Sequence, residues 1–411
     1  MILILIDYLK NSWQFAFPSV LTYYSTRMLL AAITSLLLCL FLGPFFIKKL
    51  YELKIGQTIR KEECPLLGKL HEKKQNTPTM GGILILTSML ISLFLWMDLT
   101  HIFTLILLVT TLFLGLIGGR DDYLKLKYKN TKGMSAKHKL FFQLLLSSLI
   151  ASYFIFPSFA QSIEVNGWFP PPIIKESISF KANLPSSGLA KEKKIDLNGK
   201  EYISRIYFPF FKEPVLVLKG ASLFFAFFFI FFVITGASNA TNLTDGLDGL
   251  AAGCLILIAS CLAVIAFVCN HTQIAAYLNI LYIEGSGEIA IYLSALVGAC
   301  LGFLWYNGHP AQVFMGDTGS LTLGGIIGVC AVLLRKEFLL GLVGGVLVAE
   351  ALSVIIQVAS FRLCNKKRVF LCTPIHHHFE YLGWPETKVV LRFWIIGLLL
   401  AIIGLASIKF Q

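Results

Sequence analysis

Five of the eight aspartates in the chain lie in three short polar motifs, where gathered carboxylates could bind a metal ion or accept a proton. They are Asp121, Asp122, Asp245, Asp248 and Asp317. Oxygen atoms of carboxylates and phosphates are the ligands that Mg²⁺ prefers. Burying a carboxylate without a partner is costly, so each motif also needs a nearby cation. The three motifs therefore predict a site for Mg²⁺ and a phosphorylated substrate.

The first motif combines the adjacent acids Asp121 and Asp122 with Lys125. On a helix, Asp122 and Lys125 share a face, and Asp121 points about 100° away from Asp122. One carboxylate is then held by the lysine while the other faces a substrate or Mg²⁺. The alternative is a solvated helix C-terminus with an ordinary ion pair.

The second motif places Asn239, Asn242, Asp245 and Asp248 at intervals of three residues, with glycines around the last acid. A helix or a tight turn would align these amides and carboxylates along one stripe. Such a stripe suits a nucleotide or a sugar ring. The alternative is that the same residues cap the ends of two neighbouring helices.

The third motif places Asp317 in a Gly-Asp-Thr-Gly-Ser run that leads into an apolar block. The free N–H groups at a helix N-terminus favour phosphate, but the Asp317 carboxylate would repel it. We therefore expect Mg²⁺ to bind Asp317 and to bridge to a diphosphate. An ordinary N-cap is the alternative.

Three consecutive histidines, His376, His377 and His378, are followed closely by Glu380. Neighbouring side chains diverge by about 100° on a helix and about 180° on a strand, so the three imidazoles cannot all bind one metal ion. We expect them to reach phosphate oxygens, with Glu380 as an orienting partner. The alternative is a basic surface turn near lipid headgroups.

The composition shows what must position these motifs. Of the 411 residues, 56% are hydrophobic and 14% charged, and the mean hydropathy is +0.75, whereas a soluble domain carries about 25% charged residues. Apolar blocks of membrane-spanning length predict an all-α polytopic membrane protein with ten spans. The blocks cover residues 26–47, 81–97, 102–118, 140–157, 215–236, 243–268, 289–306, 318–334, 337–359 and 389–409.

Basic residues predict the orientation. Residues 48–78, 120–139 and 360–388 carry 8, 7 and 5 Lys or Arg, and the positive-inside rule places such loops in the cytoplasm. Both termini are then outside, and all three acidic motifs lie at cytoplasmic span ends. The net charge of +12 is explained in this way, and we expect no nucleic acid as a partner.

The remaining expectations concern the chain as a whole. We expect one transmembrane domain over residues 1–411, with no cleavable signal peptide. Residues 158–214 form an external insertion with one hairpin and a β-like stretch over 201–211. The ionisable residues Glu350 and Arg392 lie in or near spans, which makes each a functional candidate. The alternative is that they pair with each other or with backbone and lock the bundle, so we count neither among the catalytic residues.

Several motifs resemble those of the bacterial phospho-N-acetylmuramoyl-pentapeptide transferase family, translocase I of peptidoglycan synthesis. The strings are TPTMGG at 77–82, DDYLK at 121–125, TKG at 131–133, SNATNLTDGLDGLA at 238–251, PAQVFMGDTGSL at 310–321 and PIHHHFE at 374–380. They cover nearly the whole chain in the family's order. The wider superfamily of polyprenyl-phosphate N-acetylhexosamine-1-phosphate transferases shares the acidic motifs.

The resemblance implies transfer of phospho-MurNAc-pentapeptide from its UDP carrier to undecaprenyl phosphate, giving lipid I and UMP with Mg²⁺ as cofactor. It implies a multi-pass protein of the bacterial inner membrane with its active site on the cytoplasmic face. The expected partners are the two substrates and the lipid bilayer, with a homodimer as an open alternative.

The resemblance also implies roles for individual residues. Asp317 is the expected Mg²⁺ ligand, and Asp121 is the expected base that deprotonates the acceptor phosphate. Asp122 lies next to Asp121 and is a further catalytic candidate. We add His377 to these candidates. We favour direct attack by the acceptor over a covalent intermediate. The other expected contacts are with substrate. The phosphates would be screened by Lys125, Lys129 and Lys137, and the nucleoside would contact Lys74, Asp248, Asn307 and Phe314. The sugar–diphosphate path would be lined by Asn239, Asn242 and Asp245. The diphosphate itself would lie beside His376, His377 and His378.

The sequence departs from the family's pattern at Gly119, Arg120 and Asn76, and its external insertion is long. An arginine beside Asp121 either weakens it as a base or points to phosphate. Two other functions remain as alternatives. One is a sister enzyme that transfers GlcNAc-1-phosphate, and the other is an ion-coupled transporter or flippase, which would place its acids near mid-span.

Overall fold

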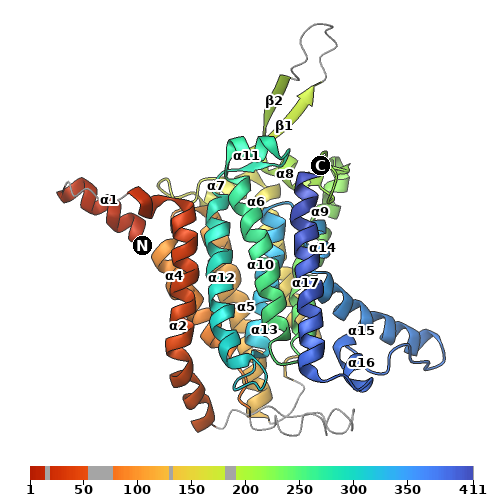
Figure 1. Cartoon of the computed structure of the whole chain (residues 1–411). Coiled ribbons are helices and arrows are strands. Elements are labelled where there is room, and N and C mark those ends of the chain that lie inside the picture. The colour runs from red at the N-terminus through yellow and green to blue at the C-terminus, as the bar shows by residue number, and fades with distance from the viewer. Residues whose placement is uncertain (14–18, 54–76, 129–132, 181–190, 411) are drawn as a thin grey trace.

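The computed structural model describes residues 1–13, 19–53, 77–128, 133–180 and 191–410, and these form a bundle of long helices (Figure 1). The long helices are α2 (Tyr24–Glu52), α4 (Gly82–Trp96), α5 (Ile102–Lys127), α6 (Ala136–Ile155), α9 (Leu223–Thr244), α10 (Leu250–Cys269), α12 (Ser286–Asn307), α13 (Gly316–Leu333), α15 (Gly345–Leu363) and α17 (Glu386–Lys409). Nine of them are long and apolar enough to cross a membrane, and α4 is shorter. The predicted all-α polytopic fold is confirmed.

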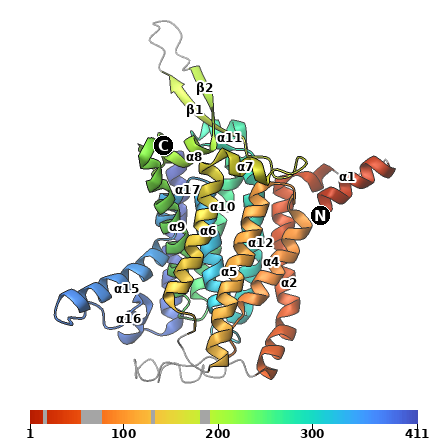
Figure 2. The ribbon, with the colours of Figure 1, turned by 180° about the vertical axis from the view of Figure 1, so that it is seen from behind.

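The ninth predicted span, over residues 337–359, is not one helix. It divides at Gly344 into α14 (Glu337–Val343) and α15. In both views of the ribbon, α15 slants away from the bundle and carries the short α16 (Ile375–Tyr381) beside it (Figures 1 and 2). The apolar block runs through both helices without interruption, so hydropathy alone does not reveal the break.

Helix α13 lies inside the bundle, and its glycines explain how it fits there. It packs against α5, α9, α4 and α10. A side chain at Gly324 or Gly328 would collide with α9, and one at Gly325 would collide with Leu114 of α5. Small residues let membrane helices approach closely. This span has a weak hydropathy signal because it contacts other helices and needs few large apolar side chains.

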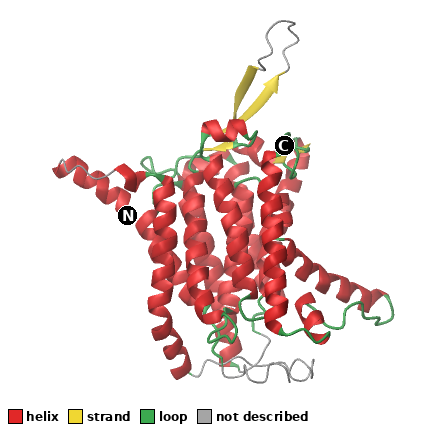
Figure 3. Cartoon of the chain, viewed as in Figure 1, coloured by secondary structure: helices red, strands yellow, loops and turns green. Residues whose placement is uncertain are grey.

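The insertion forms a hairpin at one end of the bundle (Figure 3). Strand β1 (Ile174–Phe180) pairs antiparallel with β2 (Lys191–Leu197) and also with β5 (Tyr282–Ile283), in the order β2-β1-β5. The predicted hairpin is confirmed. The strand predicted over 201–211 is mostly wrong, because Asn198 and Glu201 form a capping box that starts α8 (Gly199–Ser204).

Short elements complete the fold. After α8, strand β3 (Arg205–Ile206) pairs with β4 (Leu216–Val217). The others are helices α1 (Ile2–Trp13), α7 (Pro157–Ile163) and α11 (Thr272–Tyr277), and the 3₁₀ turns at Ser19–Thr22 and Gly220–Ser222. The hydroxyl of buried Tyr202 in α8 donates to the carbonyl of Leu333, so the insertion is fixed to the end of α13.

The acidic motifs and the insertion lie at opposite ends of the bundle. Helix α17 begins at Glu386, whose carboxylate accepts a hydrogen bond from the Asp248 N–H. It ends at Lys409, whose ammonium group contacts Tyr277 of α11, beside the hairpin. The C-terminus and the insertion therefore lie at one end and the acidic motifs at the other (Figure 1). This relative placement is the one that the sequence predicts.

A buried ion pair joins three helices at the hairpin end. The Arg27 guanidinium of α2 lies 2.8 Å from the Glu288 carboxylate of α12, and both side chains are nearly inaccessible. The same carboxylate accepts from the Asp98 N–H at 2.9 Å, and Arg27 donates to the Trp96 carbonyl at 3.1 Å. The pair therefore holds α2, α12 and the end of α4 together.

We predict that Glu288→Gln lowers the free energy of unfolding by about 3–5 kcal/mol, because it leaves the buried Arg27 charge without its counter-ion. Equilibrium unfolding in detergent measures the effect. The matched control is Glu52→Gln, which breaks an exposed pair with Lys49 (3.8 Å) and should change stability by less than about 1 kcal/mol. Equal effects of the two substitutions would contradict the prediction.

Candidate active site

Three of the five aspartates meet at the end of the bundle away from the hairpin. The C-terminal part of α5 supplies Asp121 and Asp122, and the first turn of α13 supplies Asp317. One carboxylate oxygen from each lies within 4.8 Å of the others, an arrangement that could hold a metal ion. Helix α5 approaches α13 closely because Gly118 has no side chain to meet the Asp317 carbonyl.

Asp122 caps helix α13. Its carboxylate accepts hydrogen bonds from the N–H groups of Asp317 (3.1 Å) and Thr318 (2.9 Å) and from the Thr318 hydroxyl (2.7 Å). An anion is stabilised at a helix N-terminus by unpaired N–H groups and by the helix dipole. The anion at this terminus is a carboxylate of the protein, so these N–H groups already have a partner.

Two lysines neutralise the other two acids. The Lys125 ammonium lies 2.7 Å from Asp121 and 3.0 Å from Asp317. The Lys139 ammonium, from the first turn of α6, lies 3.0 Å from Asp121 and 2.6 Å from Asp317. The predicted pairing of Lys125 with Asp122 is wrong. Asp122 is occupied by α13, and Lys125 reaches Asp121 one full turn away on the same helix.

Asp121 is held on all sides. One of its oxygens accepts from the Met134 N–H at 2.6 Å, and the other faces both lysines. Its side chain has no exposed surface, whereas that of Asp317 is 13% exposed. Gly133, at φ +53°, brings the backbone against this carboxylate, where any side chain would collide with it. Asp317 is therefore the more open of the two lysine-paired acids.

The charge of this cluster fits a divalent cation. Three carboxylates and two ammonium groups leave one negative charge, and Asp245 lies nearby at the C-cap of α9. Burial and the charges of Asp317 and Asp122 raise the pKa of Asp245 to about 7. A further cation would relieve this repulsion, and oxygen ligands suit Mg²⁺. Within the cluster of three acids, Asp317 could reach such an ion most directly, because its side chain is 13% exposed and Asp121 and Asp122 are buried.

The predicted Asn–Asp stripe begins on a helix but divides at its end. Asn239 and Asn242 lie in the last turns of α9. The Asn242 amide donates to Asp317 (3.0 Å) and to Ser320 (2.9 Å), whereas the Asn239 amide donates to Gln143 of α6 (3.2 Å). Asn242 therefore belongs to the acidic cluster, and Asn239 belongs to the packing of α6 against α9.

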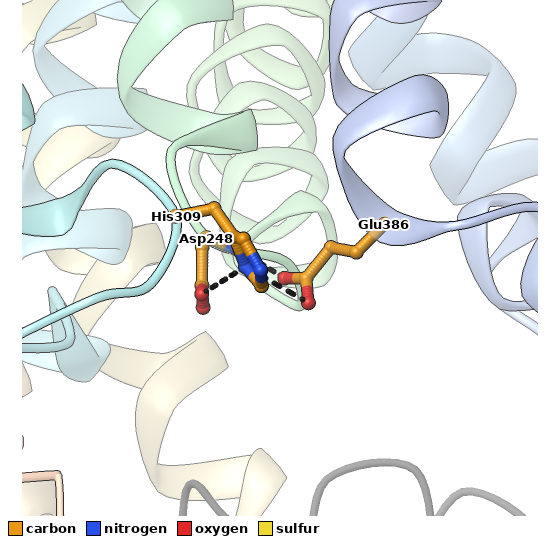
Figure 4. A group of neighbouring side chains, drawn as sticks. All are labelled: Asp248, His309 and Glu386. Atoms are coloured by element: carbon orange, nitrogen blue, oxygen red, sulfur yellow. Dashed lines mark hydrogen bonds and ion pairs between the residues drawn. The ribbon is translucent and has the colours of Figure 1, made fainter.

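Asp248 belongs to a second cluster, with His309 and Glu386 (Figure 4). The three come from the turn before α10, the loop after α12 and the first turn of α17. The His309 Nδ1 lies 2.9 Å from the Asp248 carboxylate and 3.5 Å from that of Glu386. The Ala311 N–H also donates to Asp248, at 3.1 Å. This cluster braces two loops against α17.

The other expected nucleoside contacts lie at the end of α12 and on the loop that follows it. The buried Asn307 amide accepts from the Gly249 N–H (3.0 Å) and donates to the Val313 carbonyl (2.9 Å), so it fixes the loop's shape. Partly buried Phe314 is anchored through its backbone to Pro78 and Gly81. The nucleoside role of these residues stays a prediction. Lys74 and Lys129 lie outside the described residues.

The three histidines have three different partners. The buried His376 Nδ1 lies 3.0 Å from Glu350 of α15, and its ring packs against Gly246 beside Asp245. His377 pairs with Glu380 at 2.6 Å, so the expected orienting partner is confirmed. His378 accepts from the Leu371 N–H at 3.2 Å. As the sequence indicates, they do not point at one ion.

Several residues of the site were not expected from sequence. Glu350 pairs with His376 instead of with Arg392. Its carboxylate lies 3.0 Å from the His376 Nδ1 and accepts from the His376 N–H at 3.5 Å, so the expected contact with backbone is present. Lys139 occupies the place expected for Lys137, which is exposed. Ser135 is the N-cap of α6, so the positions of the following side chains around the helix are counted from this residue. Two residues apart on a helix, Lys137 and Lys139 point about 200° apart. The N-cap at Ser135 was the sequence signal that could have shown that Lys137 and Lys139 point in different directions.

The described residues form a bundle of membrane-length helices with a carboxylate–ammonium cluster at one end, which defines a membrane protein with a site suited to a metal ion and phosphate. The model of Glycosyl transferase family 4 matches residues 198–335, and the Phospho-N-acetylmuramoyl-pentapeptide-transferase signature 1 matches residues 74–86. A phospho-N-acetylmuramoyl-pentapeptide-transferase of Protochlamydia amoebophila (strain UWE25) is 73% identical over 411 residues, with 100% of each chain covered.

Proteins of the same name are similar over nearly the whole chain. Those of Desulfotalea psychrophila and Brachyspira hyodysenteriae are each 42% identical, and the matches cover 97% and 95% of both chains. The chain therefore belongs to the phospho-N-acetylmuramoyl-pentapeptide transferase family, as its motifs predict. It is a multi-pass membrane transferase.

We predict that Lys139→Met lowers the transfer rate about 100-fold, because it removes a charged donor placed between Asp121 and Asp317. Lys137→Met is the matched control two residues away, and it should retain most of the activity. Steady-state rates of both variants in detergent measure the difference. If Lys137→Met is the more damaging substitution, the assignment of Lys139 to the site is wrong.

Proposed function

We propose that the chain transfers phospho-MurNAc-pentapeptide from UDP-MurNAc-pentapeptide to undecaprenyl phosphate, which gives lipid I and UMP. The name of the relatives that match the chain over nearly its full length supports this choice of substrates. The observation that carries it is the cluster of Asp121, Asp122 and Asp317 with two lysines at the ends of membrane-length helices. A phosphate carried by a lipid and a soluble nucleotide can meet only at such a boundary.

The proposed site faces the cytoplasm, where the nucleotide donor is found. The support is the basic content of the loops at this end, since residues 120–139 and 360–388 carry 7 and 5 Lys or Arg. The proposed reaction requires residues of one chain. The homodimer stays a separate prediction.

In the proposed reaction, an oxygen of the acceptor phosphate attacks the β-phosphorus of the donor. The bond between this phosphorus and the α–β bridging oxygen breaks, and UMP leaves. Lys125 and Lys139 meet the incoming phosphates first, because their side chains are 29% and 18% exposed and Asp121 behind them is not exposed. Their charges screen the repulsion between the two phosphates.

The proton of the acceptor phosphate passes to Asp121, the proposed base. The Met134 N–H and the two lysines fix this carboxylate in one orientation. Asp122 acts at a distance from the reacting atoms, because it holds the N-terminus of α13 and so positions Asp317. His377, oriented by Glu380, stays a candidate for contact with the diphosphate.

Mg²⁺ is the proposed cofactor. Asp317 would hold it, because this carboxylate is partly exposed and lies beside Asn242, whose amide already donates to it. The ion would neutralise charge on the diphosphate.

UMP release in detergent tests the function. Purified protein is given undecaprenyl phosphate with either UDP-MurNAc-pentapeptide or UDP-GlcNAc, and the lipid-linked product is identified by mass. We expect product from the first donor only. Product from UDP-GlcNAc alone would establish the sister activity instead. No UMP release without a sealed membrane would favour a transporter.

We predict that Asp317→Asn lowers turnover at least about 100-fold while the protein stays folded, because the metal loses its charged ligand. Mn²⁺ binding, measured by electron paramagnetic resonance, should weaken in parallel. Asp196→Asn on the hairpin is the control, since that side chain is 78% exposed and far from the site end. Near-normal turnover of Asp317→Asn, or unchanged Mn²⁺ binding, would remove the metal assignment.

A further inference from the structure

The outer face of α17 carries two cations close to one aromatic ring. Lys388 and Arg392 are one helical turn apart, and both are exposed. The Lys388 ammonium lies 5.2 Å from the centre of the Trp384 ring, and the Arg392 guanidinium carbon lies 4.1 Å from it. These distances are typical of cation–π contacts. Neither the proposed reaction nor the buried packing of the bundle uses this group.

Trp384 is a rigid platform for the two cations. Its ring is stacked on Phe379 of α16, with the ring centres 4.7 Å apart and the planes inclined by 21°. Its backbone N–H donates to the Phe379 carbonyl at 3.1 Å. Because both cations lie over this one ring, they are close enough together to meet one anionic group. A fixed pair of positive charges is suited to one anionic group.

An apolar stripe continues from the cations along α17. Leu391, Ile395, Leu399 and Ile402 are 50–57% exposed and follow one another at intervals of three or four residues. Residues at this spacing share one helix face. The opposite face is buried in the bundle, for example at Val389 and Phe393. The exposed face therefore presents two cations at one end and hydrocarbon along its length.

The depth of Arg392 in the membrane requires a partner for its charge. Helix α17 has 24 residues, which span about 36 Å, slightly more than the hydrocarbon core of about 30 Å. Arg392 lies six residues, about 9 Å, from the start of the helix. Side chains on a helix tilt toward its N-terminus, so this guanidinium reaches back toward the headgroup layer.

The nearest carboxylate on α17 is directed elsewhere. Glu386 accepts a hydrogen bond from the Asp248 N–H and lies 3.5 Å from His309, on the side of the acidic loops. Among the described residues, no carboxylate forms an ion pair with Lys388 or Arg392. A charge at this depth is unfavourable without a counter-ion. The chemistry that complements this face is an anionic phosphate attached to acyl chains.

We propose that Lys388, Arg392 and Trp384 form a binding site for the phosphate of an anionic diacyl phospholipid. The acyl chains lie along the stripe of Leu391, Ile395, Leu399 and Ile402. The site faces bulk lipid on the outside of α17, so it is separate from the acceptor site that the proposed function requires.

Native mass spectrometry of the full chain in detergent tests the proposal, with dioleoylphosphatidylglycerol as the anionic probe and dioleoylphosphatidylcholine as the neutral probe. We expect the variant Lys388→Gln/Arg392→Gln to bind the anionic lipid about 25-fold more weakly, or about five-fold for each charge lost. Binding of the neutral lipid should not change. Lys388→Arg, which keeps the charge, should bind the anionic lipid like the unaltered protein.

The matched control is Lys366→Gln/Lys367→Gln, which removes two exposed charges from the loop after α15. We expect this variant to keep its affinity for the anionic lipid within two-fold. Equal weakening in both double variants would mean general charge attraction and would overturn the proposal. Should the α17 double variant unfold, Lys388→Gln alone replaces it, and a loss of less than two-fold would overturn the proposal.

The acceptor lipid supplies a further discriminating measurement. We expect the KM for undecaprenyl phosphate to be the same in the α17 double variant and in the unaltered protein. A raised KM with unchanged phosphatidylglycerol binding would mean that the face serves the acceptor, and the proposal would be wrong. This outcome does not depend on which nucleotide donor the chain uses, so the proposed function can fail independently.

Discussion

Mutual repulsion of three buried carboxylates is the constraint on which this end of the molecule depends. Like charges within about 5 Å repel by roughly 3–4 kcal/mol per pair at an effective dielectric constant of about 20. The protein offsets this repulsion in two ways. Asp122 accepts hydrogen bonds from the N-terminus of α13, and Asp121 and Asp317 form ion pairs with the ammonium groups of Lys125 and Lys139. Apart from the pair of Lys125 with Asp121 within α5, these contacts join α5, α6 and α13, so the charge balance also holds the helices together.

The same constraint explains the arrangement of the helices. Asp122 can reach the first N–H groups of α13 only if α5 and α13 are nearly in contact, and Gly118 permits this approach. The glycines of α13 then let α9 pack equally closely on its other side, which brings Asn242 to Asp317. The acidic end is thus the direct result of small residues in the interior, and the lipid-facing surface takes no part in it.

The sequence predicted much of this site from residue types. All five aspartates lie at the expected end of the bundle, the histidines do not converge, and Glu380 orients His377. It failed where partners depend on helix phase or on distant segments. Lys125 was assigned to the wrong aspartate because spacing along α5 does not reveal that α13 already occupies Asp122. Glu350 was expected to pair with Arg392 or with backbone. The structure pairs it with the ring and the N–H of His376, because α15 leaves the bundle at Gly344.

The sequence by itself determined the class of protein, the approximate spans and the motifs that place the chain in its family, because hydropathy and residue identity are properties of local segments. The tertiary structure alone decided which acid caps a helix, which lysine reaches the cluster and which histidine is buried. These choices depend on distances between segments up to about 200 residues apart in the chain, such as Asp122 and Thr318. Such distances are set by how closely the helices pack, and no local pattern encodes that.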